Sequence, residues 1–503
     1  MELLYHLATG FGVALEPANL FACFVGVFIG TLIGVLPGIG PVGAMSLLLP
    51  VTFKSSPEAA IIMLAGIYYG SMYGGSTTSI LVNIPGEAAS VVTCLDGYQM
   101  ARQGRAGAAL GIAAFGSFIA GTFAVVGLML VAPPLSRFAL RFGPPEYFSL
   151  MVLGLTILVY LAHGSMVKAL IMGLLGIVLG LIGLDPFNTK ARLTFGQMDL
   201  MDGIGLVPIV MGLFGVSEVL LNIERQVTRE ALKTKIGGLL PSAQDWLESK
   251  WALIRGTVLG FFLGILPGGG GVIASFISYA VEKKFSKTPE LFGKGAIAGV
   301  AGPESANNAA AGGAFIPLLT LGIPTNAVIA LLLGALMIHG VQPGPLLMKQ
   351  NPGLFWGVIA SMYIGNVMLL VLNLPLIGIW VQVLKIPYRI LFPIILLLCL
   401  VGVYSISNSV FDIYIMIGFG LFGYLMRKFE YEGAPLILAF VLGPMVEVNL
   451  RKSLIMSDGN FFIFFTRPLS AFFIILAIVL LVFPLIPGVG KKRDKIAALD
   501  EPD

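Results

Sequence analysis

Two clusters of hydroxyl and amide side chains interrupt sequence that is otherwise apolar and almost free of charge. The first cluster runs from Ser76 to Asn83, and the second runs from Glu304 to Asn326. Hydroxyl and amide groups donate hydrogen bonds to carboxylates, and their oxygens are suitable ligands for a sodium ion. These residue types predict a site that binds a small anion together with a cation.

A break marked by proline and glycine lies upstream of each cluster. The segment Leu36–Gly40 reads Leu-Pro-Gly-Ile-Gly, and Leu266–Gly270 reads Leu-Pro-Gly-Gly-Gly. Proline removes a backbone hydrogen bond and glycine accepts left-handed geometry, so each break frees backbone amides and carbonyls. The N-terminus of a half-helix attracts anions, and free carbonyls coordinate cations. A single break would indicate a simple kink, but its repetition favours a binding role.

These features give two predicted sets of site residues, and no catalytic residue is expected. Substrate contacts are predicted at Gly38, Gly40, Ser76, Thr77, Thr78, Asn83, Gly268, Gly270, Asn307, Asn308, Thr325 and Asn326. Ligands for a coupling sodium ion are predicted at Ser79, Gly86, Glu304, Ser305 and Gly322. The alternative role of the hydroxyls is hydrogen bonding between neighbouring helices, and Thr325 and Asn326 would also suit a helix N-cap. Glu87 is expected in the first turn of a helix.

The elements that position these residues are expected to lie in a membrane. Of the 503 residues, 57% are hydrophobic and only 11% are charged, with a mean hydropathy of +0.95 and a net charge of +4. A soluble protein has about a quarter of its residues charged, so the composition argues against a disordered chain, a nucleic-acid-binding protein and an ordinary cytosolic enzyme. The three dispersed cysteines and the lack of a P-loop motif argue against a disulfide framework and a built-in ATPase.

Charge-free stretches recur along the chain, for example Pro17–Phe53 and Ser305–Met348. A spanning helix needs about 20 mostly apolar residues, and several stretches are too long for one span and too short for two. We therefore predict an all-α polytopic membrane protein with about ten to twelve transmembrane segments, some of them broken or re-entrant helices.

Four motifs recur in the same order in the two halves of the chain. The matching pairs are 30–40 with 260–270, 74–86 with 312–325, 144–147 with 386–389, and 202–218 with 432–447. An ordered set of four indicates a duplication. The loop that contains Lys283, Lys284, Lys287 and Lys294 has only Lys54 in its first-half counterpart, as expected if the two repeats are inverted across the membrane.

The predicted organisation follows from this duplication. It comprises an N-terminal segment (1–16), membrane repeat 1 (17–222), a polar linker (223–249), membrane repeat 2 (250–450), a C-terminal transmembrane segment (451–490) and a solvated tail (491–503).

The motifs also resemble those of a known family, the large membrane subunit of the tripartite tricarboxylate transporters. The resemblance rests on Leu36–Pro41, Tyr73–Ser76, Asn83–Gly86, Asp96–Ala101, Gly302–Asn308 and Gly322–Asn326, and it extends over nearly the full chain. It implies a secondary active transporter that imports a di- or tricarboxylate, such as citrate, by symport with Na⁺ or H⁺, and it implies no cofactor besides that ion. It also implies a small four-helix membrane subunit, a periplasmic solute-binding protein that delivers the substrate, and the bacterial inner membrane. A homodimer of the complex stays open, and no nucleic acid partner is expected.

Two other classes of protein stay open as alternatives. One is a channel or a permease subunit energised by a separate ATPase, and the other is an intramembrane lipid-modifying enzyme. The duplicated pattern of break and polar cluster favours a carrier with a central site. An enzyme would need a concentrated set of acids, histidines or metal ligands, whereas the three histidines are dispersed.

Overall fold

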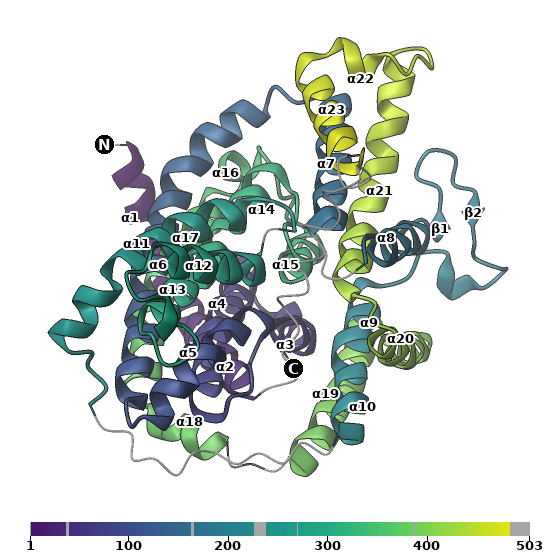
Figure 1. Ribbon diagram of the computed structural model, residues 1–503. Helices are drawn as coiled ribbons and strands as arrows, with labels where there is room; N and C mark the ends of the chain where they lie inside the picture. The colour runs from purple at the N-terminus through teal and green to yellow at the C-terminus, as the bar shows by residue number, and fades with distance from the viewer. Residues whose placement is uncertain are drawn as a thin grey trace.

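Most of the described part of the chain is helical, as Figure 1 shows for this computed structural model. The structure describes residues 2–36, 40–161, 165–225, 238–268, 270–384, 386 and 388–482. Within these ranges the one sheet is a small hairpin of two antiparallel strands, β1 (Gly183–Leu184) and β2 (Ala191–Arg192), in which Gly183 lies opposite Arg192. The prediction of an all-α polytopic membrane protein is confirmed, with this hairpin as a minor addition.

The helices form two groups, seen at the left and right of Figure 1. The left group contains α1 (Glu2–Ala14), α2 (Pro17–Val35), α4 (Pro57–Val82), α5 (Val91–Arg102), α6 (Ala106–Ala139), α11 (Ala243–Ile265), α12 (Gly271–Phe285), α13 (Ala298–Gly313), α14 (Phe315–Leu321), α16 (Leu347–Gln350), α17 (Pro352–Asn373) and α18 (Ile377–Val383). The right group contains α7 (Pro144–Leu161), α8 (Met166–Gly180), α9 (Leu206–Val210), α10 (Ser217–Arg225), α19 (Tyr388–Ser407), α20 (Val410–Lys428), α21 (Gly433–Met456), α22 (Ile463–Thr466) and α23 (Pro468–Val482).

Two helices, α3 (Gly40–Leu48) and α15 (Ala327–Ile338), lie between the groups and contact each other. Short turns complete the fold: the 3-10 turns η1 (Leu49–Lys54), η2 (Ala88–Ser90), η3 (Met198–Leu200) and η5 (Pro289–Leu291), and the π-helical segment η4 (Met211–Val216).

The core is built around α4 and α13, whose residues are almost all buried. Glycines allow this close packing. A Cβ at Gly30 of α2 would lie 2.6 Å from the Ile67 carbonyl oxygen of α4, and a Cβ at Gly260 of α11 would lie 2.6 Å from Ala306 Cα of α13. Small residues spaced by four therefore bring one helix pair into backbone contact in each predicted half. The inverted relation between the halves and the domain boundaries stay predictions.

The predicted helix breaks are present. Helix α2 ends at Val35 and α3 begins at Gly40, while α11 ends at Ile265 and α12 begins at Gly271. A second helix break lies at the end of the first polar cluster and within the second polar cluster. There, Asn83 ends α4 with φ of 59°, and Gly322 ends α14 with φ of 69°. Both residue types accept this left-handed geometry, which stops a helix.

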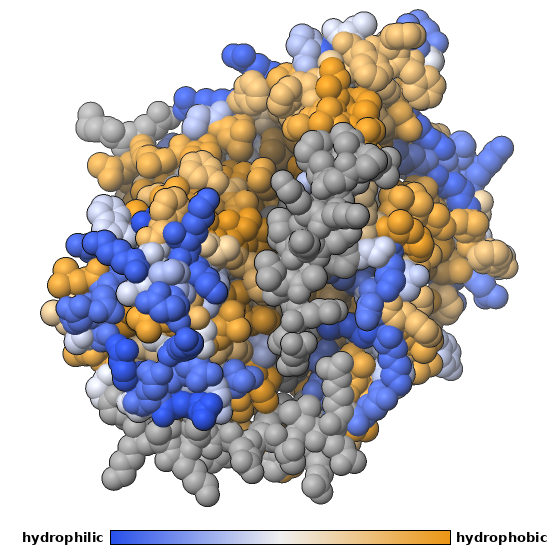
Figure 2. Space-filling model, in the orientation of Figure 1, coloured by the Kyte–Doolittle hydropathy of each residue, from blue (hydrophilic) through white to orange (hydrophobic). Residues whose placement is uncertain are grey.

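Seven helices in the described part of the chain are long and apolar enough to cross a membrane. They are Pro17–Val35, Ala106–Ala139, Leu206–Glu224, Pro352–Asn373, Ile390–Ser407, Val410–Lys428 and Gly433–Met456. Apolar side chains also cover much of the molecular face in Figure 2. Shorter apolar helices, among them α7 and α15, accompany these seven, so the expected count of ten to twelve segments stays a prediction.

Candidate functional site

A buried carboxylate, Glu304 of α13, lies at the centre of the polar clusters. Its side chain is 1% exposed. Its Oε2 accepts a hydrogen bond from Ser76 Oγ of α4 at 2.5 Å, and its Oε1 accepts one from Thr93 Oγ1 of α5. Among the described residues, no lysine or arginine forms an ion pair with it. An isolated buried carboxylate is costly in free energy, so this group needs a proton or a bound cation to balance its charge.

A second buried acid, Glu87, joins the first-half break to α13. Its Oε2 accepts a hydrogen bond from the Ala89 amide at 2.6 Å, which caps η2. Its Oε1 accepts one from Asn307 Nδ2 at 3.1 Å. Glu87 therefore lies at a helix start, and it also contacts a predicted site residue. The Ser79 hydroxyl belongs to the same region because it donates to the Ser90 carbonyl at 3.0 Å.

The second-half break contacts two predicted site residues, Thr325 and Asn307. The Gly268 amide donates to the Thr325 carbonyl at 2.8 Å, and φ of 76° at Gly268 requires glycine there. The N-cap of α12 is Gly270, which has no side chain to cap the helix. A Cβ at Gly271 would collide with Asn307 Oδ1. The uncapped start of α12 therefore lies against Asn307, and the positive end of its dipole favours an anion.

Two buried side-chain oxygens near this break have no hydrogen-bond partner among the described residues. They are Asn307 Oδ1 and Thr325 Oγ1. A buried polar atom without a partner is rare and costs free energy, so both atoms fit a ligand or an ordered water. Both residues belong to the predicted substrate set.

Other predicted residues link elements of the protein to one another. Asn308 Nδ2 donates to Ser117 Oγ at 2.7 Å and to the Glu304 carbonyl at 3.0 Å. Asn326 Oδ1 accepts from the Ile329 amide at 3.0 Å, and its Nδ2 donates to Tyr68 OH at 3.1 Å. Asn326 is therefore a helix N-cap, as its position after the proline indicated, and it also joins α15 to α4.

The remaining predicted residues lie in separate places. Thr78 Oγ1 donates to the Val35 carbonyl at 2.8 Å, Ser305 Oγ donates to the Ala301 carbonyl at 2.8 Å, and Asn83 is exposed at the end of α4. Gly86 packs against the Gly34 carbonyl, Gly322 lies at the end of α14, and Gly40 begins α3. Gly38 lies outside the described residues. The five predicted sodium ligands are thus spread over several elements, and the ligand role of each stays a prediction.

The polar network includes residues that no motif singled out. Thr93 and Ser117 bond directly to predicted residues, and Asn366 Oδ1 of α17 accepts a hydrogen bond at 2.5 Å from Tyr73 OH of the Tyr73–Ser76 motif. These residues stand alone in apolar sequence, where the only available signal is one polar side chain at a buried helix position. No group of three or more His, Cys, Asp or Glu residues lies together in the described ranges.

The fold and the buried network define a multi-pass membrane protein with a polar centre. A comparison with family models agrees with this class. The model of the tripartite tricarboxylate transporter TctA family matches residues 20–438. The chain therefore belongs to this family of transporter subunits, which normally work with two further subunits in a tripartite system.

Two curated proteins of Agrobacterium vitis are similar to the chain. One, described as an uncharacterised 52.8 kDa protein in the TAR-I ttuC' 3' region, is 53% identical over 496 residues and covers 99% of each chain. The other, an uncharacterised protein in the TAR-II ttuC' 3' region, is 53% identical over 242 residues, which are 48% of this chain and all of that protein. No solved structure matches the chain.

Proposed function

We propose that this chain is the translocating subunit of a cation-coupled importer of di- or tricarboxylates. In this proposal it lies in the bacterial inner membrane, where a small membrane subunit accompanies it and a periplasmic solute-binding protein delivers the substrate. The family membership supports the subunit role. The buried network supports the coupling and the substrate class.

The observation that supports the coupling most strongly is Glu304. This carboxylate is buried, receives hydrogen bonds from two hydroxyl groups, and has no basic partner among the described residues. Such a carboxylate must take up a proton or bind a cation to balance its negative charge. Such an intramembrane acid is suited to carry a coupling proton or to balance a coupling metal ion.

The substrate class follows from the groups around the second-half break. The uncapped N-terminus of α12 and the amides of the polar clusters are neutral donors, and neither cluster contains an arginine. Neutral donors and helix dipoles stabilise carboxylates without the strong retention that an ion pair would give. A citrate-like substrate that must be released again fits this arrangement.

Uptake by proteoliposomes containing the three subunits tests the proposal. Labelled citrate and smaller dicarboxylates are supplied outside, with an inward gradient of Na⁺ or H⁺ and no ATP. The proposal expects accumulation of at least one carboxylate, driven by at least one gradient, and little uptake of an uncharged analogue. Uptake that needs ATP would favour the permease alternative, and equilibration without accumulation would favour a channel.

A further inference from the structure

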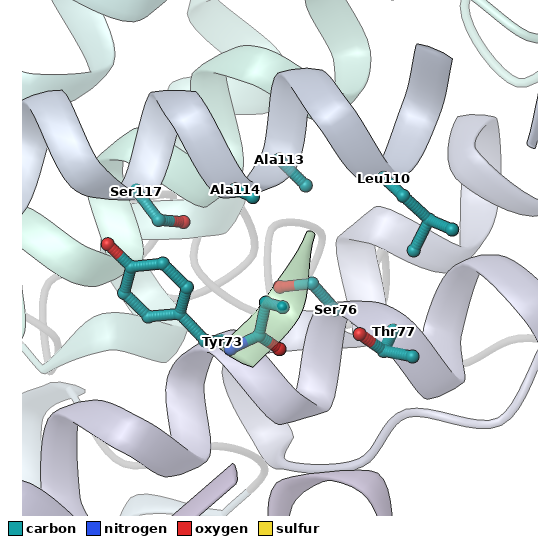
Figure 3. Close-up of a pocket in the computed structure, with 8 residues that line it drawn as sticks. Tyr73, Ser76, Thr77, Leu110, Ala113, Ala114 and Ser117 are labelled. Atoms are coloured by element: carbon teal, nitrogen blue, oxygen red, sulfur yellow. The ribbon is translucent and has the colours of Figure 1, made fainter. Parts of the chain in front are cut away.

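A small cavity lies between α4, α6 and the end of α17, next to Ser76, which bonds Glu304. It has room for about one water molecule. Its polar lining consists of Tyr73, Ser76, Thr77, Ser117 and Asn373, and three apolar residues of α6 complete it. Figure 3 shows Ser117 of α6 and Tyr73 of α4 on one side of the cavity, and Ser76 and Thr77 of α4 on the other.

Two oxygens of this lining have no hydrogen-bond partner in the ranges that the structure describes. Asn373 is 4% exposed, and its Nδ2 donates to the Leu369 carbonyl at 3.0 Å, which leaves the buried Oδ1 unpaired. Thr77 is 2% exposed, and its hydroxyl forms no hydrogen bond within the described part of the chain. An amide oxygen can only accept, so Asn373 calls for a donor or a cation in the cavity.

The surrounding charge favours a cation. Helix α17 ends at Asn373, and the C-terminus of a helix carries a partial negative charge. Ser76 also lines the cavity, and it bonds the Glu304 carboxylate at 2.5 Å. No lysine or arginine lines the cavity. A neutral water would satisfy the oxygens, but it would leave the negative potential of the carboxylate and the helix end unbalanced.

We propose that this cavity binds a monovalent cation of about the size of Na⁺, with Asn373 Oδ1 and the hydroxyls of Thr77, Ser76 and Ser117 as ligands. Oxygen atoms of this kind suit a hard cation, and Glu304 supplies the balancing charge through Ser76. The inference rests on the proposed function, because it identifies this ion with the coupling cation. It places part of the site on α17, outside both polar clusters.

Sodium affinity of substituted proteins tests the site. Two readouts are used: the Na⁺ concentration that gives half-maximal carboxylate uptake by proteoliposomes, and the Na⁺-dependent rise in Tm of the purified protein. The variants are Asn373→Leu, Asn373→Asp and Thr77→Val. Thr31→Val is the matched control, because the buried Thr31 hydroxyl bonds only the Val27 carbonyl of its own helix, at 2.8 Å.

Loss of a ligand should weaken Na⁺ affinity by roughly ten- to hundredfold in Asn373→Leu and Thr77→Val, since a hydrogen bond to a charged group has a comparable energy. Asn373→Asp keeps the oxygen and adds negative charge, so its Na⁺ affinity should equal or exceed that of the wild type. This rescue distinguishes a ligand from a packing residue. The control Thr31→Val should behave as the wild type.

Three results would overturn the inference. If Na⁺ drives wild-type uptake but Asn373→Leu and Thr77→Val keep their Na⁺ affinity, the ion binds elsewhere and the proposed function stands. If H⁺ drives uptake and Na⁺ changes neither uptake nor Tm, the cavity holds only water, and the carrier function again stands. If no gradient drives uptake, the proposed function fails, and unchanged Tm in Na⁺ then also rejects the cavity site.

Discussion

At the scale of single residues, the centre of this protein is a set of hydrogen bonds between side chains that are far apart in sequence. Ser76 and Thr93 hold Glu304, while Asn307 holds Glu87. Each pair joins the first half of the chain to the second. Protonation of either acid, or binding of a cation to it, therefore alters contacts between the halves. Coupling between substrate and cation requires such a link.

Asn307 is predicted to matter more for transport than for stability. Its Nδ2 bonds the carboxylate of Glu87 and its Oδ1 is unpaired. Replacing it by alanine removes a hydrogen bond to a charged group, about 1.5–3 kcal/mol. Asn307→Ala should therefore raise the substrate or cation concentration for half-maximal uptake roughly ten- to hundredfold, while size-exclusion profiles in detergent stay monodisperse.

Asn449→Ala is the control for this prediction, because the Asn449 amide bonds only the Met445 carbonyl of its own helix. Unchanged affinities in Asn307→Ala would mean that Asn307 is a helix-packing residue.

Asn326→Ala is expected to differ from both Asn307→Ala and Asn449→Ala, since Asn326 caps α15. It should lose about 1 kcal/mol of stability in addition to any effect on transport.

The sequence allowed some of these residues to be found and not others. Glu304 and Asn307 were predictable because acids and amides that interrupt a long apolar run have few other uses. Thr93 and Asn373 were not, because a single threonine or asparagine in a helix usually bonds its own backbone. Their contact with the site depends on how α5 and α17 pack against α4 and α13, which local sequence does not specify.

At the scale of elements, stripes of small residues determine how closely the helices approach. Gly260 is predicted to be intolerant of even one added carbon, because a Cβ there would overlap the backbone of Ala306. Gly260→Ala should cost about 1–3 kcal/mol by overpacking and should lower the Tm and the yield of monodisperse protein. Gly173→Ala in α8 is the matched control, since nothing lies within 4 Å of a Cβ at that position. Equal Tm values for the two variants would contradict this packing.

The hairpin of β1 and β2 is held to α21 by Asp185. The Phe187 amide donates to its carboxylate at 2.8 Å, and Arg451 Nη1 donates at 2.8 Å. These bonds lower the pKa of Asp185 below its ordinary value. The group therefore stabilises the fold at a pH above its unfolded pKa, about 3.9, and this contribution is lost as the pH falls through the folded pKa.

Acid titration of the Tm tests this interaction. Wild-type protein in detergent should lose Tm below about pH 4. Asp185→Asn should have a lower Tm at pH 7 and a smaller loss on acidification. Asp199→Asn, at an exposed position of η3, should behave as the wild type. A Tm for Asp185→Asn that equals the wild type at pH 7 would show that the ion pair does not hold the hairpin.

The helix breaks were predictable at this scale because proline and glycine act locally. Both Leu-Pro-Gly segments separate two helices, as expected. The hairpin was not predicted, because its strands have two residues each and lack the alternating pattern that marks a strand. Side-chain contacts with α21 hold it instead, and those come from sequence more than 250 residues away.

At the scale of the whole molecule, the two halves are predicted to be inverted across the membrane. Lys54 and Lys287 lie in corresponding loops and are both exposed. In a protein whose three native cysteines are replaced, Lys54→Cys and Lys287→Cys should react with an impermeant maleimide from opposite sides. The prediction follows from the difference in basic charge between the loops. Labelling of both from one side would exclude the inversion.

The overall class was the most predictable property, because composition alone places most of the chain in a membrane. The division into two groups of helices was not, since it does not coincide with the two predicted repeats. Helices α2 and α11 come from different halves but lie in the same group. Helices α7 and α21 also come from different halves, and they contact each other in the second group. Such mixing arises from tertiary packing between repeats.

The proposed coupling of carboxylate entry to cation entry predicts a reciprocal flux, which can be measured. Coupling requires that a substrate gradient move the ion as well. Proteoliposomes with equal Na⁺ and pH on both sides should take up labelled Na⁺, or become acidic inside, when carboxylate is added outside. Glu304→Gln should abolish this ion flux, while Glu248→Gln, at an exposed position of α11, should preserve it. Carboxylate uptake by the wild type without movement of either ion would show that carboxylate entry and cation entry are not coupled.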